Sequence, residues 1–363
     1  MRKDELWFWL MNCDGIGRKK TEYLLKQFHT VENIYQASSE ELLKVPKITA
    51  KNVNAMTKEK ELWKRKYERM KRYGIQFVLR EDSVYPDKLR QLEDAPFALY
   101  VRGRLPDETK KTIAIIGARD CSTYGREMAL WFSKELSKAG MQVVSGLARG
   151  VDGYAHGGAI EAKAPTFAVL GSGIDVCYPK EHEWMYDRIK TDGGIISEYG
   201  LGVPALAGQF PMRNRLISGL SDGILVIEAR ERSGSLITAD MGLEQGKDIF
   251  AIPGRVGDSL STGCNNLIKM GAYLAETPDD ILMNYHVGVL DKPKDWEKNN
   301  YMLETKEKIV YANLSYNPKH VNELTIDTRF SLSEVMECLI SLELKGYIKQ
   351  TMKNFYIVCN DEI

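Results

Sequence analysis

Glycine-rich turns that carry cationic or hydroxyl side chains follow several short apolar runs in the middle of this chain. The run IAIIG leads into Arg119 and Ser122, and the run QVVSG leads into Arg149. Glycine allows the backbone to approach a ligand closely, and the free N–H groups at the start of a following helix attract an anion. Arginine adds a planar fork that matches two phosphate oxygens. The pattern therefore predicts loops that bind phosphate groups.

The candidate phosphate contacts extend over several of these turns and one further helix start. The segment FPMRNR places two arginines ahead of an apolar helical stretch, and the segment SGS adds hydroxyl donors. Each arginine has a competing interpretation as half of a structural ion pair. The candidates that this pattern indicates are Gly117, Ala118, Arg119, Ser122, Gly146, Arg149, Gly171, Gly173, Arg213, Asn214, Arg215, Ser233, Gly234 and Ser235.

The elements that must position these turns alternate between strand-like and helical patterns from Thr112 onward. The strand-like runs do not alternate between apolar and polar residues, which is typical of a parallel sheet covered by helices on both faces. We therefore expect an α/β fold with an extended Rossmann-like, doubly wound, mostly parallel sheet, whose carboxyl edge holds all of the turns. Strands are expected at 113–117, 141–146, 167–171, 194–198, 223–229, 248–254 and 272–276, and helices at 125–139, 152–162, 182–190, 213–220, 235–245 and 264–270.

Four segments are distinguished by their patterns. Residues 1–72 have apolar residues at helical spacing, and residues 73–285 contain the predicted sheet. Residues 286–303 are polar and lack periodicity, so we interpret them as a linker. In residues 304–363, helical patterns precede Gly346 and two strand-like runs, an order that resembles a winged helix-turn-helix domain.

Composition and cysteine usage indicate a globular cytoplasmic protein. The chain has 363 residues, of which 44% are hydrophobic and 28% are charged, enough for several packed cores. Its six cysteines form no C-x-x-C pair, so neither a zinc site nor a redox motif is predicted, and unpaired thiols suit a reducing compartment. No apolar stretch approaches the length of a membrane span, and the first apolar run is too short for a signal peptide.

The absence of several motifs restricts the chemistry. There is no G-x-x-x-x-G-K-[ST] segment, and the first glycine turn, GARDCSTYG, is not G-x-G-x-x-G. No H-E-x-x-H or deaminase signature occurs, so no metal or cofactor is expected. His156 and His182 are candidate acids or bases, but His156 lies within a helical pattern and is interpreted as a packed residue.

Charge is balanced over the chain but not along it. The 50 basic and 50 acidic residues give a net charge of zero. Residues 112–285 contain 16 basic and 21 acidic residues, a net charge of −5. A nucleic-acid site in this segment must therefore depend on a few placed cations and loop amides rather than on a broad positive field.

Three segments carry a specific resemblance. GARDCSTYG, SGLARGVDGYAH and FPMRNRLISGL are similar to motifs of the DprA/Smf family, the DNA-processing protein A of natural transformation, and the match is dense over residues 85–276. The resemblance implies a protein that binds single-stranded DNA without catalysis, dimerises, protects the strand and helps to load the RecA recombinase. It also implies contacts from Ser145 in the second loop and from Lys180, the lysine after a tyrosine–proline pair.

The flanking domains depart from the family pattern. The N-terminal segment resembles a SAM or helix-hairpin-helix module, but its second hairpin, VPKIT, lacks a glycine, so we do not expect DNA contact there. The presumed recognition helix of the winged-helix domain carries Glu334, Glu337 and Glu343, which favours protein contact or a structural role over reading a duplex. For the implied homodimer, Leu267, Ile268 and Met270 could form an apolar face, although the same residues suit a core.

Two other functions remain open. The segment SGSLITADMGLEQG is loosely similar to the catalytic element of nucleoside-monophosphate phosphoribohydrolases, with Asp240 or Glu244 as the acid. A nucleotide-signal sensor that uses the same loops is the third interpretation.

Overall fold

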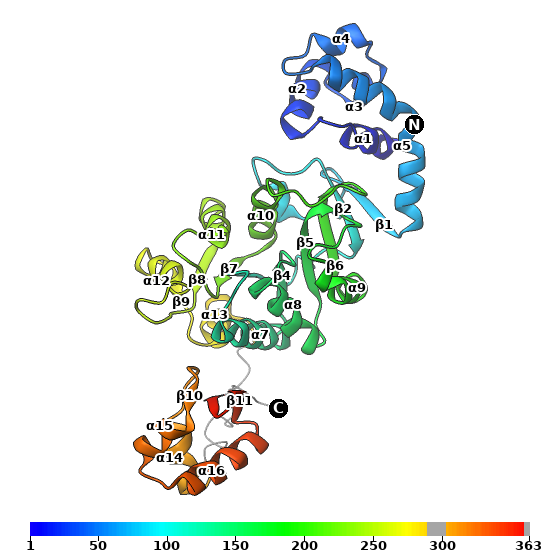
Figure 1. Ribbon diagram of the computed structural model, residues 1–363. Helices are drawn as coiled ribbons and strands as arrows, with labels where there is room; N and C mark the ends of the chain where they lie inside the picture. The colour runs from blue at the N-terminus through cyan, green and yellow to red at the C-terminus, as the bar shows by residue number, and fades with distance from the viewer. Residues whose placement is uncertain (289–302, 359–363) are drawn as a thin grey trace. The chain divides into compact units, whose positions relative to one another are not determined.

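The computed structural model describes residues 1–288 and 303–358, which belong to two compact units, 1–287 and 288–363 (Figure 1). Most of the expected linker, 286–303, and also Cys359, lie outside the described residues. Within the described part of the chain, no helix is both long and apolar enough to cross a membrane.

A sheet of nine strands forms the centre of the first unit, in the order β1-β2-β6-β5-β4-β3-β7-β8-β9. The strands from β6 to β9 in this order are parallel, while β2 is antiparallel to both β1 and β6. The predicted mostly parallel, doubly wound sheet is therefore confirmed. The strands are β1 Ile75–Leu79, β2 Ala98–Gly103, β3 Thr112–Ile116, β4 Gln142–Ser145, β5 Thr166–Gly173, β6 Gly194–Tyr199, β7 Gly223–Val226, β8 Asp248–Ala251 and β9 Tyr273–Leu274.

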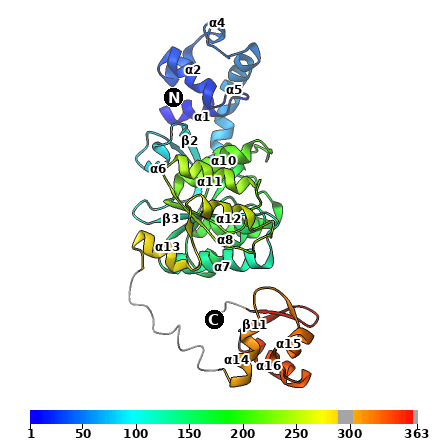
Figure 2. The same ribbon diagram turned by 90° about the vertical axis from the view of Figure 1, so that its left-hand side faces the viewer.

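Helices cover both faces of this sheet because its central strands have no polar face. On β5, Ala168 and Leu170 enter one hydrophobic core, while Phe167 and Val169 enter another. Such continuous apolar strands require a helix layer on each side (Figure 2). The helices are α6 Asp87–Arg90, α7 Thr123–Lys138, α8 Val151–Glu161, η1 Lys180–His182, α9 Glu183–Asp192, α10 Gln209–Leu220, α11 Gly234–Glu244, α12 Thr262–Lys269 and α13 Pro278–Tyr285.

One helix begins earlier than the sequence predicts. We expected a helix over 213–220, but α10 begins at Gln209 and includes Pro211 in its first turn. A proline is tolerated there because the first N–H groups of a helix have no intrahelical partner. The earlier start brings Phe210 to the carboxyl edge of the sheet.

The N-terminal helices pack on the β1–β2 edge and share a core with the sheet (Figure 1). The Asn12 side chain donates a hydrogen bond to the Tyr100 hydroxyl at 2.7 Å, and Trp7 stacks on Phe97 with ring centres 5.2 Å apart. These contacts join the two parts into one unit. The helices are α1 Lys3–Met11, α2 Arg18–Phe28, α3 Val31–Gln36, α4 Ser39–Leu43 and α5 Ala50–Arg72.

The second unit has the predicted winged-helix pattern. Three helices surround a separate core that contains Val310, Leu324 and Leu339. The two predicted wing strands, β11 and β12, pair with each other. The short strand β10 pairs with β12 and completes a three-stranded antiparallel sheet in the order β10-β12-β11. The elements are α14 Thr305–Ala312, β10 Lys319–His320, α15 Val321–Thr328, α16 Leu332–Leu344, β11 Ile348–Met352 and β12 Phe355–Val358.

Candidate functional site

The glycine turns lie together at the carboxyl edge of the parallel strands. β3 is the first of these strands; the chain then adds β4, β5 and β6 on one side of it, and β7, β8 and β9 on the other. The strand order thus reverses between β3 and β7, which is where open α/β sheets have their ligand crevice. The turns after β3, β4 and β5 are neighbours because these strands are hydrogen-bonded in sequence.

An arginine and two aromatic rings from three separate segments form an open row at this edge, which we call the Arg–aromatic row. The Arg119 guanidinium lies 5.4 Å from the ring centre of Phe210, and the Tyr178 ring centre lies 5.6 Å from that of Phe210. Arg119 is exposed, Phe210 is half-buried, and Tyr178 is 49% exposed. Among the three, the sequence predicts only Arg119 as a contact. The Tyr-Pro and Phe-Pro pairs within glycine-rich segments are the signal that could have found the rings.

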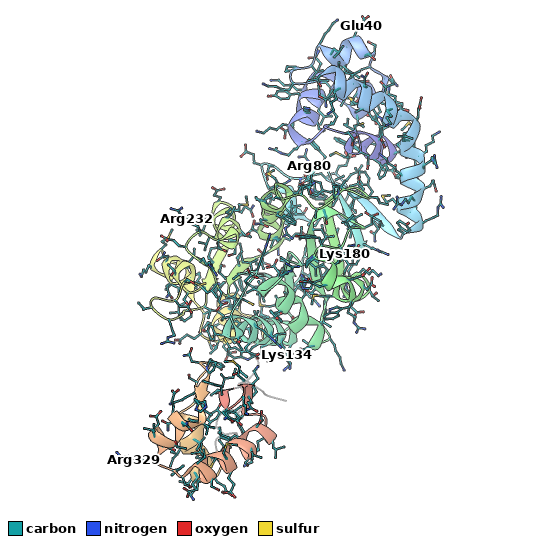
Figure 3. All side chains as sticks on the ribbon, viewed as in Figure 1. Glu40, Arg80, Lys134, Lys180, Arg232 and Arg329 are labelled. Atoms are coloured by element: carbon teal, nitrogen blue, oxygen red, sulfur yellow. The ribbon has the colours of Figure 1, made fainter. Side chains whose placement is uncertain are left out.

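Arg149 is exposed next to this row, but it already has an anionic partner. Its Nε lies 2.6 Å from Glu181 Oε1, and its Nη2 lies 3.1 Å from Glu181 Oε2. The ion pair lowers the pKa of Glu181 through the hydrogen bonds from Arg149. Lys180, which is labelled in Figure 3, is exposed as well.

Arg213 requires a correction, because the structure places it inside the molecule rather than facing a ligand. Only 4% of the residue is exposed, and its Nη1 donates to the carbonyl oxygens of Gly146, at 2.7 Å, and of Val169. Burial lowers the pKa of Arg213 to about 10, so it remains a cation at neutral pH. The buried carboxylate of Asp152, which accepts from the Gly146 N–H at 3.1 Å, favours this charge. Arg213 therefore links the residue after β4 to the middle of β5.

Arg215 requires the same correction. Its side chain is 5% exposed and forms ion pairs with Glu198 at 2.5 Å and with Asp94 at 3.1 Å. The competing interpretation, a structural ion pair, is therefore the one that the structure supports. Asn214, between the two arginines, is half-buried, and its Nδ2 lies 3.5 Å from the Gly234 carbonyl oxygen.

The backbone N–H and the hydroxyl of Ser122 also form hydrogen bonds within the protein. Its N–H donates to Glu228 Oε2 at 2.8 Å, and its hydroxyl donates to Glu228 Oε1 at 2.5 Å. The same hydroxyl accepts from the Gly125 N–H at 3.1 Å, so it caps α7. Glu228 is 3% exposed at the carboxyl end of β7, and burial raises its pKa. A carboxylate of the chain thus takes the anion position at the start of α7.

Several smaller candidates are corrected because they fill the interior. The Ser145 hydroxyl is fully buried and donates to the Ile115 carbonyl at 2.7 Å. A Cβ at Gly171 would lie 2.8 Å from the Phe210 ring, and one at Gly173 would lie 2.5 Å from the Gly200 carbonyl oxygen. These glycines permit close packing and offer little surface. The remaining candidates lie on the edge with varied exposure: Gly117, Ala118, Ser233, Gly234 and Ser235.

The two histidines do not form a catalytic pair. His156 is fully buried, its Nδ1 lies 2.8 Å from the Thr166 hydroxyl, and burial lowers its pKa to about 3. It is a neutral packed residue, as expected. His182 Nδ1 lies 3.0 Å from the Leu147 carbonyl oxygen, which ties η1 to the loop after β4. In the described residues no group of three metal-ligating side chains occurs.

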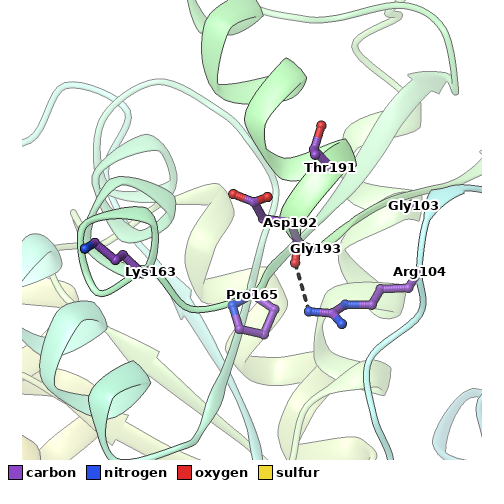
Figure 4. A pocket seen from close by; sticks show the side chains of 7 residues that line it. All are labelled: Gly103, Arg104, Lys163, Pro165, Thr191, Asp192 and Gly193. Atoms are coloured by element: carbon purple, nitrogen blue, oxygen red, sulfur yellow. Dashed lines mark hydrogen bonds between the residues drawn. The ribbon is translucent and has the colours of Figure 1, made fainter.

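A hollow of about 570 Å³ lies away from these loops (Figure 4). It opens at the amino ends of β5 and β6, next to Pro165 and Gly193, where Arg104 donates to the Asp192 carbonyl at 2.9 Å. Because ligands of such sheets bind at the opposite edge, we do not assign the candidate site to it.

The three residues of the predicted dimer face differ in how far they are buried. Leu267 is 5% exposed and belongs to the core beneath α12, so its interface assignment is corrected. Ile268 packs partly against the same core. Met270 is 75% exposed and stands beside the edge strand β9, where Tyr273 and Leu274 are 51% and 45% exposed.

Comparisons with known proteins agree with this architecture. Residues 76–286 match the model of the DNA recombination-mediator protein A family, residues 299–351 match the DprA winged helix domain, and residues 10–59 match a SAM-like helix-hairpin-helix tandem. Protein Smf of Escherichia coli is 38% identical over 274 residues, covering 74% of this chain and 73% of that protein. DNA processing protein DprA of Streptococcus pneumoniae is 42% identical over 204 residues, covering 56% and 72% respectively.

Two solved structures are similar as well. DNA processing protein A from Streptococcus pneumoniae has a TM-score of 0.66 at 32% identity, covering 78% of this chain and 98% of that one. The protein of the same name from Helicobacter pylori, whose structure is described by its single-stranded DNA binding mode, has a TM-score of 0.53 at 28% identity, covering 59% and 96%. The match over most of the sheet unit, with both flanking domains in order, means that this chain belongs to the DNA recombination-mediator protein A (DprA/Smf) family.

Proposed function

We propose that this protein binds single-stranded DNA, without cleaving it, at the carboxyl edge of its parallel sheet. The Arg–aromatic row is the observation that carries the proposal, because exposed rings and guanidinium planes are surfaces on which unpaired bases stack. A duplex keeps its bases stacked on each other, so the row favours single strands. The named binding mode of the Helicobacter pylori relative supports the same ligand.

The phosphate contacts that we propose are fewer than the sequence indicates. Arg119, Arg149 and Lys180 are exposed at the edge, whereas Arg213 and Arg215 are buried and hold the loops in place. Three cations that neutralise phosphates of a single strand give a slope of about −2 for log K against log salt. The protein then relies on stacking for much of its affinity, consistent with the negative charge of this segment.

The first prediction concerns strand preference and Arg119. The protein should bind a fluorescent single-stranded oligonucleotide more tightly than its duplex, and Arg119→Ala should weaken single-strand binding about 10-fold for all sequences, since phosphate contacts carry no base information. Fluorescence anisotropy across a salt series measures both. Arg104→Ala is the matched control, because it removes the same charge at the opposite end of the strands. Equal loss in the two variants would contradict the proposed site.

The second prediction concerns Tyr178. Base stacking on an aromatic ring contributes about 1–3 kcal/mol per base, so Tyr178→Ala should weaken single-strand binding roughly 5-fold or more. Tyr178→Phe keeps the ring and should bind as the unaltered protein does. The salt slope should stay the same in both variants, because neither removes a charge. Unaltered affinity of Tyr178→Ala would show that the row does not hold bases.

We further propose a homodimer through the β9 edge. A sheet edge offers unpaired backbone groups, and here Met270, Tyr273 and Leu274 add exposed apolar surface next to it. A dimer would carry two strand-binding edges. Loading of the RecA recombinase, in the cytoplasm during DNA uptake or recombination, is the role that we infer from the family's description as a recombination mediator.

The third prediction tests that dimer. Met270→Glu places a charge on the exposed apolar surface and should convert a dimer to a monomer at micromolar concentration, as size-exclusion chromatography with light scattering measures. Met283→Glu is a control, because Met283 is 52% exposed on α13 rather than beside β9. A monomeric unaltered protein at that concentration would count against the dimer.

Glu228 argues against the nucleotide-processing and sensor alternatives at the first glycine turn. Its carboxylate holds the N–H and hydroxyl of Ser122, the groups that a nucleotide phosphate would require at the start of α7. The two acids of the hydrolase interpretation, Asp240 and Glu244, are both exposed on α11. We therefore favour a non-catalytic role.

The fourth prediction follows from the raised pKa of Glu228. A carboxyl whose pKa is higher in the folded than in the unfolded state binds its proton more tightly when folded, so its contribution to stability falls as pH rises. The free energy of unfolding of the unaltered protein, relative to Glu228→Gln, should decline between about pH 4.3 and the folded pKa and stay constant above it. Urea unfolding of both proteins from pH 4 to 8 measures the difference. A difference that does not change with pH would contradict the burial of an ionisable Glu228.

A further inference from the structure

We propose that Glu181 is an internal competitor of the DNA phosphate: it occupies Arg149 in the free protein and is displaced when a strand binds. The inference rests on the proposed function and adds a regulatory contact to the same site. Glu181 thereby lowers the affinity for single strands and restricts binding to ligands that can replace a carboxylate.

The geometry of the pair is the first argument. The two nitrogens of Arg149 contact the two oxygens of Glu181, at 2.6 and 3.1 Å, which is the two-point arrangement that a phosphate also makes with a guanidinium. A phosphate and Glu181 therefore compete for the same donors and cannot both use them.

Exposure is the second argument. The Arg149 side chain is 61% exposed and the Glu181 side chain is 52% exposed, so a ligand can reach both from solvent. An exposed ion pair is weak, because water screens it and two long side chains must be held in place. A phosphate of a strand that the protein also contacts elsewhere can consequently replace Glu181 on Arg149 without the unfolding of any helix or strand.

The rigidity of both loops is the third argument. Gly150, at φ 70°, leaves no room for a Cβ, which would lie 2.3 Å from the Ala118 and Arg119 carbonyl oxygens, so the loop of Arg149 packs against that of Arg119. His182, next to Glu181, is held at the Leu147 carbonyl. Because both backbones are fixed, the exchange is confined to the two side chains.

The consequence for charge is specific. In the free protein Glu181 neutralises Arg149, so displacing Glu181 exposes a negative charge close to the bound strand, next to Lys180. Removing that carboxylate should therefore strengthen binding. The salt slope should stay at about −2, because Arg149 neutralises a phosphate in the complex with or without Glu181.

The experiment is a double-mutant cycle on single-strand affinity, measured by fluorescence anisotropy with the full chain. Glu181→Gln should tighten binding about 3- to 5-fold and leave the salt slope at about −2. In the Arg149→Gln background the same substitution should tighten binding by less than about twofold, because the residue for which Glu181 competes is gone and only a water-screened repulsion between Glu181 and the strand is removed. Glu183→Gln, which removes an exposed carboxylate two residues further on, is the matched control and should change affinity by less than twofold.

Three results would overturn the proposal: Glu181→Gln binds no more tightly than the unaltered protein, its full gain persists without Arg149, or Glu183→Gln gives an equal gain. Each of these leaves single-strand binding by the unaltered protein intact. If the unaltered protein fails to bind single strands at all, the proposed function is wrong and the competitor role is overturned with it, so the two failures are distinguishable. Thermal unfolding of each variant confirms that the surface substitutions leave the fold unchanged.

Discussion

The contact of the buried Arg213 guanidinium with the backbone after β4 and in the middle of β5 is the constraint on which the edge depends. A cation that is nearly removed from water must be satisfied by fixed partners, and here these are two carbonyl oxygens and the field of Asp152. Glycine is required at position 146, since a Cβ would lie 2.4 Å from Arg213 Nη1. Removing the arginine would take this donor away from both carbonyls and leave the adjacent loops without a support.

Much of the fold could be predicted from the sequence because a strand that is buried on both faces consists of an uninterrupted run of apolar residues. Runs such as IAIIG and FAVLG admit no polar face, and their spacing with helical patterns determines a parallel sheet. The boundaries were less certain at α10, where Pro211 suggests a break although the first turn of a helix tolerates it.

The site was predictable only in part, because residue type does not reveal burial. Arg119 and Arg213 stand in similar glycine-rich segments, yet one is exposed and the other is 4% exposed. The partners of Arg213, which are the Gly146 and Val169 carbonyl oxygens, come from other parts of the chain. The contact between Phe210 and Tyr178 could not be predicted either, because only the tertiary fold brings their segments together.

Two exposed arginines at the edge, Arg119 and Arg149, are held in different ways, and this difference suggests how a neutral protein can bind an anionic chain. Arg119 lies over the Phe210 ring, a contact that orients the guanidinium and brings no negative charge of its own. Arg149 lies against a carboxylate, a contact that orients it and cancels its charge. A guanidinium that lies over an aromatic ring can thus bind a phosphate directly. A guanidinium that is paired with a carboxylate can bind a phosphate only after the carboxylate is displaced. Because the segment carries more acidic than basic residues, the choice of support at each arginine, rather than the number of arginines, determines the local field that a strand meets.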